Sequence, residues 1–269
     1  MSKLLIDAGN SALKWSVINA KNQRSRQHAV FYTPNLTPIQ VFTDVIALNK
    51  AECDSVLMVS VLGASFNQDA LSVAHENQLK LNNLRSLKTL GNIKNAYTIP
   101  ENLGTDRLVA MVAAYDLANK NQTEPKACLI IDSGTATTID AVDSKGYHLG
   151  GLILTGHQLS QNSLLKNTQL IPEQTHLTNK TIQPALFAKD TATAIKSGAV
   201  LGLSGAISDI CQKMEKCLEQ SSNPAKVVKV ICGGGYNELK AHLDNSFQHK
   251  PDLLMHGLQV ISNLLEEEK

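Results

Sequence analysis

Two stretches of this chain share one pattern, an apolar run that ends in Asp-x-Gly. The first reads LLIDAGNSALKWSVIN at residues 4–19, and the second reads LIIDSGTATTIDAVDS at residues 129–144. They match at Leu4/Leu129, Ile6/Ile131, Asp7/Asp132, Gly9/Gly134 and Val17/Val142. After the first glycine, Leu13, Trp15 and Val17 alternate with polar residues, which is the period-2 pattern of a half-buried strand. Each copy therefore predicts a strand, a tight turn and a second strand.

A duplicated hairpin among alternating strands and helices predicts an α/β fold with two similar lobes and a cleft between them. The chain has 269 residues, of which 43% are hydrophobic, so it is long enough for two domains of ordinary size. The polar segment NKNQTEPK at 119–126 contains a proline and follows a helix-like run. We therefore expect an N-terminal lobe over residues 1–118 and a C-terminal lobe over residues 119–269.

The remaining periodicity predicts five helices and two further strands. The helices are expected at 38–49, 67–81, 106–118, 192–219 and 237–243. The strands are expected at 55–61 and 227–231, the second of which reads VVKVI.

The composition of the chain argues against several classes of binding partner and bound metal. The formal charge of +1 and pI near 7.7 give no attraction for nucleic acid or for anionic lipid. Five cysteines without C-x-x-C spacing indicate neither a disulfide framework nor a zinc site. The start of the chain lacks the pattern of a signal peptide, and no uncharged run reaches about 18 apolar residues. We therefore expect a cytoplasmic protein with no nucleic-acid or membrane partner.

Paired Asp-x-Gly turns suit a nucleotide polyphosphate. Glycines allow the backbone to approach phosphates, carboxylates can hold cations or their waters, and polar side chains add donors, here Asn10, Ser11, Thr135 and Thr137. A single Asp-x-Gly turn is a common hairpin, but the duplication favours the functional interpretation. Lys14 has two interpretations, a solvated charge on an edge strand or a point charge that faces the transferring phosphate.

Two further motifs have both a structural and a functional interpretation. The glycines at 233–235 follow the strand VVKVIC and would either make a cramped strand-to-helix turn or leave room for an adenosine. The loop YTIPENLGTDR at 97–107 precedes a helix. There Thr105 would be an N-cap and Asp106 a first-turn acid, or Asp106 would be a base beside the guanidinium of Arg107.

Taken together, DAGNSALK, GTDR and DSGTATTID resemble the signature set of the type III pantothenate kinases. This family belongs to the superfamily of acetate kinase, sugar kinases, heat-shock-70 proteins and actin. The resemblance implies ATP-dependent phosphorylation of pantothenate to 4'-phosphopantothenate, the first step of coenzyme A synthesis. It also implies a homodimer, two ribonuclease-H-like lobes of the actin-like ATPase fold, Mg2+ or a similar divalent cation, and K+ or NH4+.

The resemblance also implies residue roles. Asp106 would be the general base, Asp7 would lie near magnesium through water, and Asp132 would hold the monovalent cation. The ATP-binding residues would be Asp7, Ala8, Gly9, Asn10, Ser11, Ala12, Leu13, Lys14 and Thr135. Pantothenate would be held by Tyr97, Gly104, Thr105, Asp106, Arg107 and, across a dimer interface, Thr191. Two positions depart from the family pattern, with Asp190 in place of asparagine and Thr155 in place of proline.

Two alternatives stay open on the same scaffold. One is another small-molecule kinase or a phosphohydrolase, since a fold alone does not define a substrate, although the GTDR loop argues against it. The other is a non-enzymatic accessory regulator. Against it stand the three aspartates Asp7, Asp106 and Asp132, and the absence of a basic DNA-binding face.

Overall fold

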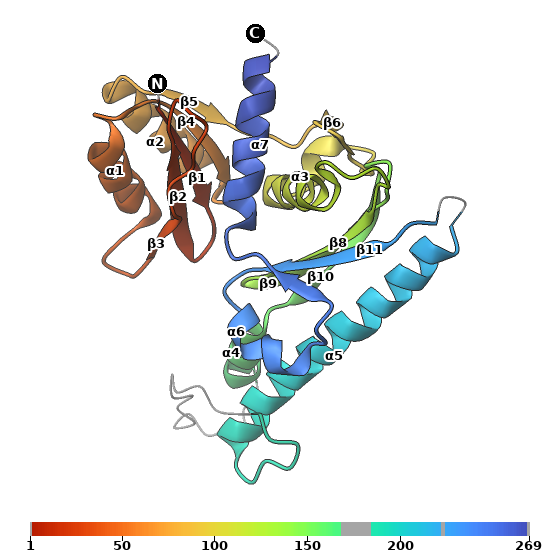
Figure 1. The fold of residues 1–269 in the computed structure, drawn as a ribbon. Coiled ribbons are helices and arrows are strands. Elements are labelled where there is room, and N and C mark those ends of the chain that lie inside the picture. The colour runs from red at the N-terminus through yellow and green to blue at the C-terminus, as the bar shows by residue number, and fades with distance from the viewer. Residues whose placement is uncertain (1, 168–183, 222–223, 268–269) are drawn as a thin grey trace. The chain divides into compact units, whose positions relative to one another are not determined.

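The computed structural model describes residues 2–167, 184–221 and 224–267. The chain divides into two compact units, and each unit is built from more than one stretch of the sequence (Figure 1). Unit 1 comprises Met1–Asn121, Gly146–His148 and Asp252–Lys269, and unit 2 comprises Gln122–Lys145 and Leu149–Pro251. This division differs from the two continuous lobes expected from the sequence, because the last helix of the chain packs within unit 1.

Unit 1 contains a five-stranded sheet with the order β3-β2-β1-β4-β5. Strand β1 pairs antiparallel with β2 and parallel with β4. The outer pairs are β2 with β3, antiparallel, and β4 with β5, parallel. The strands span β1 (Ser2–Ala8), β2 (Ala12–Ile18), β3 (His28–Phe31), β4 (Cys53–Ser60) and β5 (Lys80–Asn83).

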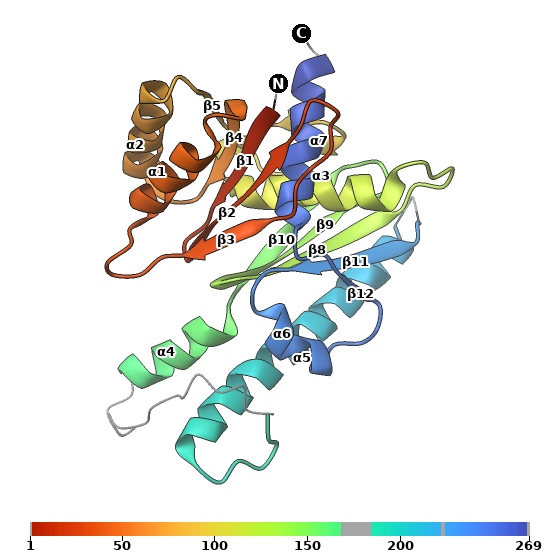
Figure 2. The ribbon, with the colours of Figure 1, turned by 60° about the vertical axis from the view of Figure 1, so that its left-hand side comes forward.

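Helices cover both faces of this sheet (Figures 1 and 2). On one face, α1 (Pro38–Asn49) and α2 (Gly63–Glu76) bury a core that includes Leu4, Ile6 and Phe42. On the other lie α3 (Thr105–Asn119) and α7 (Leu253–Glu267). A small hairpin, β6 (Thr89–Leu90) and β7 (Ile93–Lys94), and the short helix η1 (Pro100–Asn102) precede α3.

Unit 2 repeats this arrangement, with the sheet order β10-β9-β8-β11-β12. Strand β8 pairs antiparallel with β9 and parallel with β11, as β1 does with β2 and β4. The strands span β8 (Ala127–Ser133), β9 (Ala136–Val142), β10 (His148–Thr155), β11 (Val227–Cys232) and β12 (Phe247–His249). The repeated Asp-x-Gly sequence thus marks a repeat of the whole sheet, and the predicted α/β fold is confirmed.

The helices of unit 2 are α4 (His157–Asn167), α5 (Thr191–Glu219), α6 (Tyr236–Leu239) and the short η2 (Lys240–His242). Within the described ranges, α5 is the one helix whose length and hydropathy would allow it to cross a membrane. However, Leu203, Ile207 and Cys211 of α5 belong to the core of unit 2, together with residues of β8 and β9. A buried amphipathic helix of a globular domain has the same length and composition.

Several predicted elements need correction. The helix expected at 67–81 ends at Glu76, because Gln78 adopts φ +58° and the chain turns into β5. The sequence also failed to predict α7, whose pattern Gly257 interrupts. A Cβ at Gly257 would lie 2.3 Å from the carbonyl oxygen of Val109 in α3, so this glycine allows two helices to pack closely. Trp15 of β2 lies in the core of unit 1, as the alternating pattern of a half-buried strand predicts.

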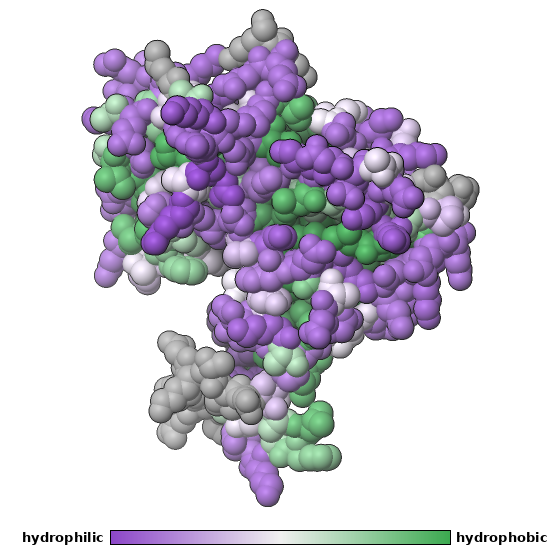
Figure 3. Space-filling model, in the orientation of Figure 1, coloured by the Kyte–Doolittle hydropathy of each residue, from purple (hydrophilic) through white to green (hydrophobic). Residues whose placement is uncertain are grey.

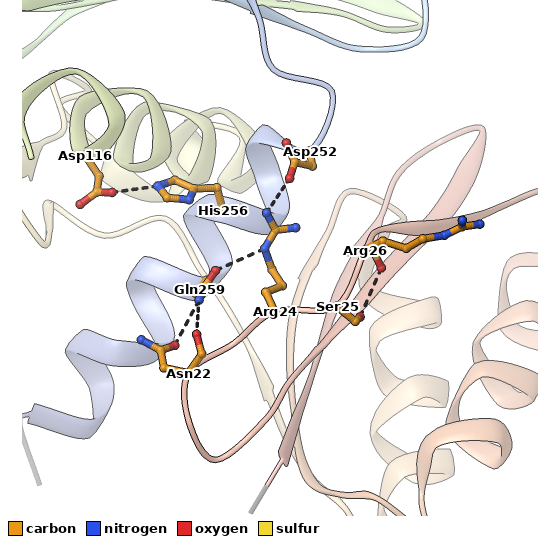
Figure 4. A network of polar contacts seen from close by, with 8 residues as sticks. All are labelled: Asn22, Arg24, Ser25, Arg26, Asp116, Asp252, His256 and Gln259. Atoms are coloured by element: carbon orange, nitrogen blue, oxygen red, sulfur yellow. Dashed lines mark hydrogen bonds and ion pairs between the residues drawn. The ribbon is translucent and has the colours of Figure 1, made fainter.

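Polar contacts attach α7 to the rest of unit 1 (Figure 4). Arg24, in the loop after β2, forms an ion pair with Asp252 at 2.5 Å and donates to Gln259 at 3.2 Å. Burial raises the pKa of Asp252. The hydrogen bond from Arg24 and the positive charge of Arg24 act in the opposite direction, and the pKa is lowered overall. On the opposite side, His256 contacts Asp116 of α3 at 2.8 Å. The C-terminal helix is therefore fixed to both the β2–β3 loop and α3.

Candidate functional site

The first Asp-x-Gly hairpin makes a three-residue turn, Gly9, Asn10 and Ser11, between β1 and β2. The amide of Gly9 donates to the carbonyl of Ala12 at 3.1 Å, and a Cβ at Gly9 would lie 3.3 Å from that oxygen. Asn10 and Ser11 are exposed at the tip. The turn thus presents backbone and polar side chains to solvent, as a phosphate-binding loop requires.

Asp7 lies one residue before the end of β1 and is buried. Its Oδ2 atom is 3.4 Å from Nζ of Lys14, the residue directly opposite on β2. Burial raises the pKa of Asp7 above its usual value, Lys14 partly opposes this, and the charge of Asp106 adds to it. A buried carboxylate with one lysine beside it is a favourable place for a further cation.

Lys14 is not on the edge of the sheet, so the edge-charge interpretation is wrong. Strand β3 pairs outside β2, with Ala29 opposite Lys14. The side chain shares a face of the sheet with Asp7, whereas its neighbour Trp15 points into the core on the other face. Lys14 therefore belongs to the charged side of the hairpin.

The second hairpin has a two-residue turn, Gly134 and Thr135, and the amide of Gly134 donates to the carbonyl of Ala136 at 3.0 Å. Asp132 is half-buried and pairs across the strands with Thr138. Thr135 is exposed at the tip. Thr137, which the sequence groups with the phosphate donors, is instead fully buried.

Two further glycine segments close on this second turn. The amide of Gly156 donates to the carbonyl of Thr135 at 3.1 Å, and a Cβ there would lie 2.3 Å from the oxygen of Gly134. Gly233 has φ +93°, and its Cβ would lie 2.4 Å from the oxygen of Ser133 and 2.5 Å from Oδ1 of Asp132. Neither position tolerates a side chain without rearrangement of the backbone. Thr155, which departs from the family pattern, therefore directly precedes Gly156, the residue whose backbone contacts the second turn.

The structure supports both interpretations of the glycines at 233–235, but at different residues. Gly233 and Gly235 make the cramped turn, and the amide of Gly235 donates to the carbonyl of Ser133 at 2.8 Å. Gly234 is exposed, and a Cβ there would meet open space. Room for a flat group against the backbone thus exists at the middle glycine.

His157, the first residue of α4, is a buried neighbour of this turn that the sequence analysis missed. A Cβ at Gly235 would lie 2.6 Å from Oγ of Ser133 and 3.2 Å from the His157 ring. Burial lowers the pKa of His157, and the charge of Glu238 in α6 opposes this. Burial thus favours the neutral form of the imidazole beside Gly235.

The GTDR loop begins α3, but its N-cap is Gly104 rather than Thr105, so the predicted cap is wrong by one position. The hydroxyl of Thr105 instead accepts from Ser86 at 3.5 Å. Oδ1 of Asp106 accepts from the amide of Arg107 at 2.8 Å, and a Cβ at Gly104 would lie 2.6 Å from the same oxygen. Glycine at 104 therefore leaves space for the half-buried carboxylate of Asp106.

Arg107 and Tyr97 come together across the loop. The guanidinium is buried, and Nη1 donates to the hydroxyl of Tyr97 at 3.1 Å. The guanidinium carbon also lies 5.8 Å from the centre of the Tyr97 ring. Two residues that the family resemblance assigns to one substrate site are thus in contact.

Asn95 organises this loop, and no sequence pattern predicts that role. The side chain is 2% exposed. Its Nδ2 donates to the carbonyls of Leu87 at 3.3 Å and Pro100 at 3.1 Å, and its Oδ1 accepts from the amide of Tyr97 at 2.9 Å. A single buried amide therefore joins three parts of the loop.

Thr191 begins α5 and is exposed, in unit 2, whereas Tyr97 and Asp106 lie in unit 1. Asp190 is the N-cap, and its side chain accepts from the amide of Thr193 at 2.8 Å. This hydrogen bond, together with the one from the Thr193 hydroxyl, lowers the pKa of Asp190. Aspartate caps a helix as well as asparagine does, so this departure preserves the local geometry.

No cluster of three or more His, Cys, Asp or Glu side chains able to hold a metal occurs among residues 2–167, 184–221 and 224–267. Asp7 and Asp132 each offer one carboxylate, in different units. One carboxylate per site suits Mg2+ in kinases, because substrate phosphates and waters supply the other ligands.

Comparisons with known proteins agree with these motifs. The family model for type III pantothenate kinase matches residues 3–213. A type III pantothenate kinase of Pseudoalteromonas translucida is 32% identical over 95% of this chain and 94% of its own. Among solved structures, a Campylobacter jejuni protein described as a Baf family transcriptional activator matches with a TM-score of 0.55 and 19% identity, covering 98% of this chain and 99% of its own.

A second solved structure extends the likeness in fold. A protein of Listeria monocytogenes described as an N-acetylmannosamine kinase matches with a TM-score of 0.50 and 12% identity, covering both chains fully. At these identities the likeness concerns the fold, which is that of the sugar kinases and actin-like ATPases. The family match, the relative and the three motifs lead to one conclusion: the chain belongs to the type III pantothenate kinase family and is a kinase that phosphorylates pantothenate for coenzyme A synthesis.

Proposed function

We propose that Asp106 is the general base of this kinase and that the reaction takes place in the cytoplasm. The carboxylate of Asp106 accepts the proton of the primary hydroxyl of pantothenate as that oxygen attacks the γ-phosphorus of ATP. The bond from the γ-phosphorus to the bridging oxygen breaks, and ADP leaves. Arg107 and Tyr97 orient the substrate, together with Gly104 and Thr105 at the start of α3.

One observation carries this proposal: the charges of Asp7 and Asp106 interact within unit 1. The charge of Asp106 raises the pKa of Asp7, so the first hairpin and the GTDR loop are close enough to interact. In a phosphotransferase, the phosphate-binding hairpin and the base must stand near the same transferring group. The two motifs are 99 residues apart in sequence, from Asp7 to Asp106, and the interaction between their charges supports a shared site.

For the nucleotide side, the proposed ATP-binding residues are those of the first hairpin, Asp7 to Lys14, with Thr135 of the second. Lys14 supplies a positive charge to the phosphates, and Gly9 permits their approach to the backbone. A divalent cation, Mg2+ or a similar ion, would be held by Asp7 through water. When bound, it neutralises charge that develops on the phosphoryl group.

For the monovalent cation, the proposed ligand is Asp132, and K+ or NH4+ is the expected ion. The half-buried carboxylate beside the exposed turn at Gly134 and Thr135 supports this assignment. Oxygen ligands next to phosphate suit a large, weakly hydrated cation. Assay in sodium-only buffer after desalting should lower turnover sharply, and undiminished turnover would remove the site.

We also propose a homodimer in which Thr191 reaches the pantothenate bound by the partner. Large apolar side chains are exposed just before α5, with Leu186 81% and Phe187 88% accessible, and apolar surface is visible near the start of this helix (Figure 3). Such a patch suits a protein–protein interface. Mixed Thr191→Arg and Asp106→Asn chains should regain activity on subunit exchange, because one composite site carries neither lesion. No recovery despite proven exchange would place each site within one chain.

The experiment that tests the function is a coupled assay of ADP release with and without pantothenate. The proposal requires release that depends on pantothenate. Release with a different acceptor alone, or with water, would favour another small-molecule kinase or a phosphohydrolase. No release with any acceptor, from a folded protein that binds ATP, would favour the accessory regulator.

A further inference from the structure

The segment Gly146–His148 packs along the loop that carries Tyr97, although β9 and most of β10, which flank it in sequence, belong to unit 2. The amide of Lys94 donates to the carbonyl of Gly146 at 2.9 Å, and Lys94 pairs with Tyr147 in a parallel bridge. Nζ of Lys94 also lies 3.0 Å from the hydroxyl of Tyr147. Three backbone and side-chain contacts therefore hold this segment beside the loop.

Gly146 makes this docking possible. Its φ is +81°, and a Cβ there would lie 2.0 Å from the carbonyl oxygen of Asn92. Any side chain would push the segment away from the loop. The close approach places His148, two residues after Gly146, beside Tyr97.

His148 is 3% exposed, and its ring stacks on that of Tyr97, with centroids 6.1 Å apart and planes 14° from parallel. Its Nδ1 accepts from the amide of Ala96 at 3.5 Å. This hydrogen bond is long and therefore weak, whereas the ring stack covers a face of the tyrosine. On its other side, the Tyr97 hydroxyl is held by Arg107.

We propose that His148 is a positioning residue for pantothenate, which acts by holding the Tyr97 ring in the orientation that the substrate requires. Asn95 holds the amide of Tyr97, Arg107 holds its hydroxyl, and His148 covers its ring face. The inference rests on the proposed role of Tyr97 in substrate binding. His148 itself touches the tyrosine and need not touch the substrate.

The chain also gives His148 a connection to the second hairpin. His148 is the first of the eight residues of β10, and the last is Thr155. The next residue, Gly156, packs against the turn at Gly134 and Thr135. One strand thus joins the residue that supports the pantothenate loop to the glycine that supports the second phosphate turn.

The test compares His148→Leu, which fills the space without a flat ring, with His148→Phe, which keeps the ring. The matched control is His28→Leu. His28 stacks on Trp15 in the same unit, at 5.3 Å, outside the candidate site. For His148→Leu we expect the KM and Kd for pantothenate to rise roughly tenfold or more, with the KM for ATP nearly unchanged. His148→Phe should recover most of this loss.

Calorimetric binding of pantothenate separates the two proposals. Absence of pantothenate-dependent ADP release from the wild type contradicts the proposed function. Equal Kd values for pantothenate in wild type and His148→Leu contradict the role of His148. So does an equal rise in the KM for both substrates, or a failure of folded His148→Phe to recover binding, because a merely structural residue would give those results. His28→Leu should leave both KM values unchanged.

Discussion

The two Asp-x-Gly hairpins share a glycine amide that donates across the turn, but they differ in turn length and in surroundings. In both, the glycine amide donates back across the turn, and a Cβ on the glycine would lie about equally far from the aspartate, 4.0 Å at Gly9 and 3.9 Å at Gly134. Asp7, however, is buried and faces a lysine, whereas Asp132 is half-buried and faces a threonine.

This difference indicates a division of work between the two copies. The first hairpin concentrates charge, since Asp7 interacts with both Lys14 and Asp106. The second hairpin is closely enclosed by glycine backbone at Gly156 and Gly233. One duplicated scaffold thus supports an electrostatic task in unit 1 and close backbone approach in unit 2.

The largest expected effect comes from removal of the charge in the first hairpin. Asp7→Asn keeps the shape of the side chain, and turnover should fall on the order of 10² to 10³, since one preorganised electrostatic contact is lost. Asp132→Asn should cost less turnover and should abolish the response to K+. Steady-state assays over a range of K+ concentrations measure both. Equal losses with equal K+ responses would show that the two hairpins are equivalent.

The second effect concerns the glycines. Gly233→Ala places a Cβ against backbone oxygen at 2.4 Å in a left-handed conformation, so unfolding free energy should fall by about 2 to 5 kcal/mol. Gly9→Ala meets its nearest atom at 3.3 Å, and the expected loss is about 1 kcal/mol or less. Denaturant unfolding of both variants measures the difference. Similar losses at both positions would contradict the steric account of the second hairpin.

A third, smaller effect has the opposite sign. The folded protein holds the Asp7 proton to a higher pH than the unfolded chain, so stability falls as the pH rises above 3.8 through the raised pKa of Asp7. Asp7→Asn should therefore raise the melting temperature of the nucleotide-free protein at neutral pH while it lowers activity. The exposed Asp69→Asn is the control and should change neither property. A lower melting temperature for Asp7→Asn would contradict the unfavourable burial of its charge.

The hairpins and the GTDR loop were predictable because each is a local pattern. An apolar strand that ends in Asp-x-Gly specifies a strand end and a turn within a few residues, and both sheets follow from the repeat. The helix at 38–49 is predicted with its observed bounds, and in the structure Thr37 and Gln40 form the capping box that begins it.

The missed residues depend on contacts between distant parts of the chain. Asn95, Gly146 and His148 have no local signature, because the carbonyls and rings that they contact are specified only by the tertiary fold. The missed helix α7 shows the same cause, since Gly257 lowers helix propensity locally in exchange for close packing on α3. The N-cap was misassigned because a first-turn acid fits either position.

The most direct test of the account is the substitution Asp106→Asn, assayed for pantothenate-dependent ADP release and for ATP binding. Asparagine has nearly the same shape and caps a helix well, so a structural acid would cost little. If Asp106 is the base, a folded variant binds ATP normally while turnover falls on the order of 10² to 10⁴. Near-normal turnover in a well-folded Asp106→Asn protein would contradict the account and leave this aspartate a favourable charge at a helix N-terminus.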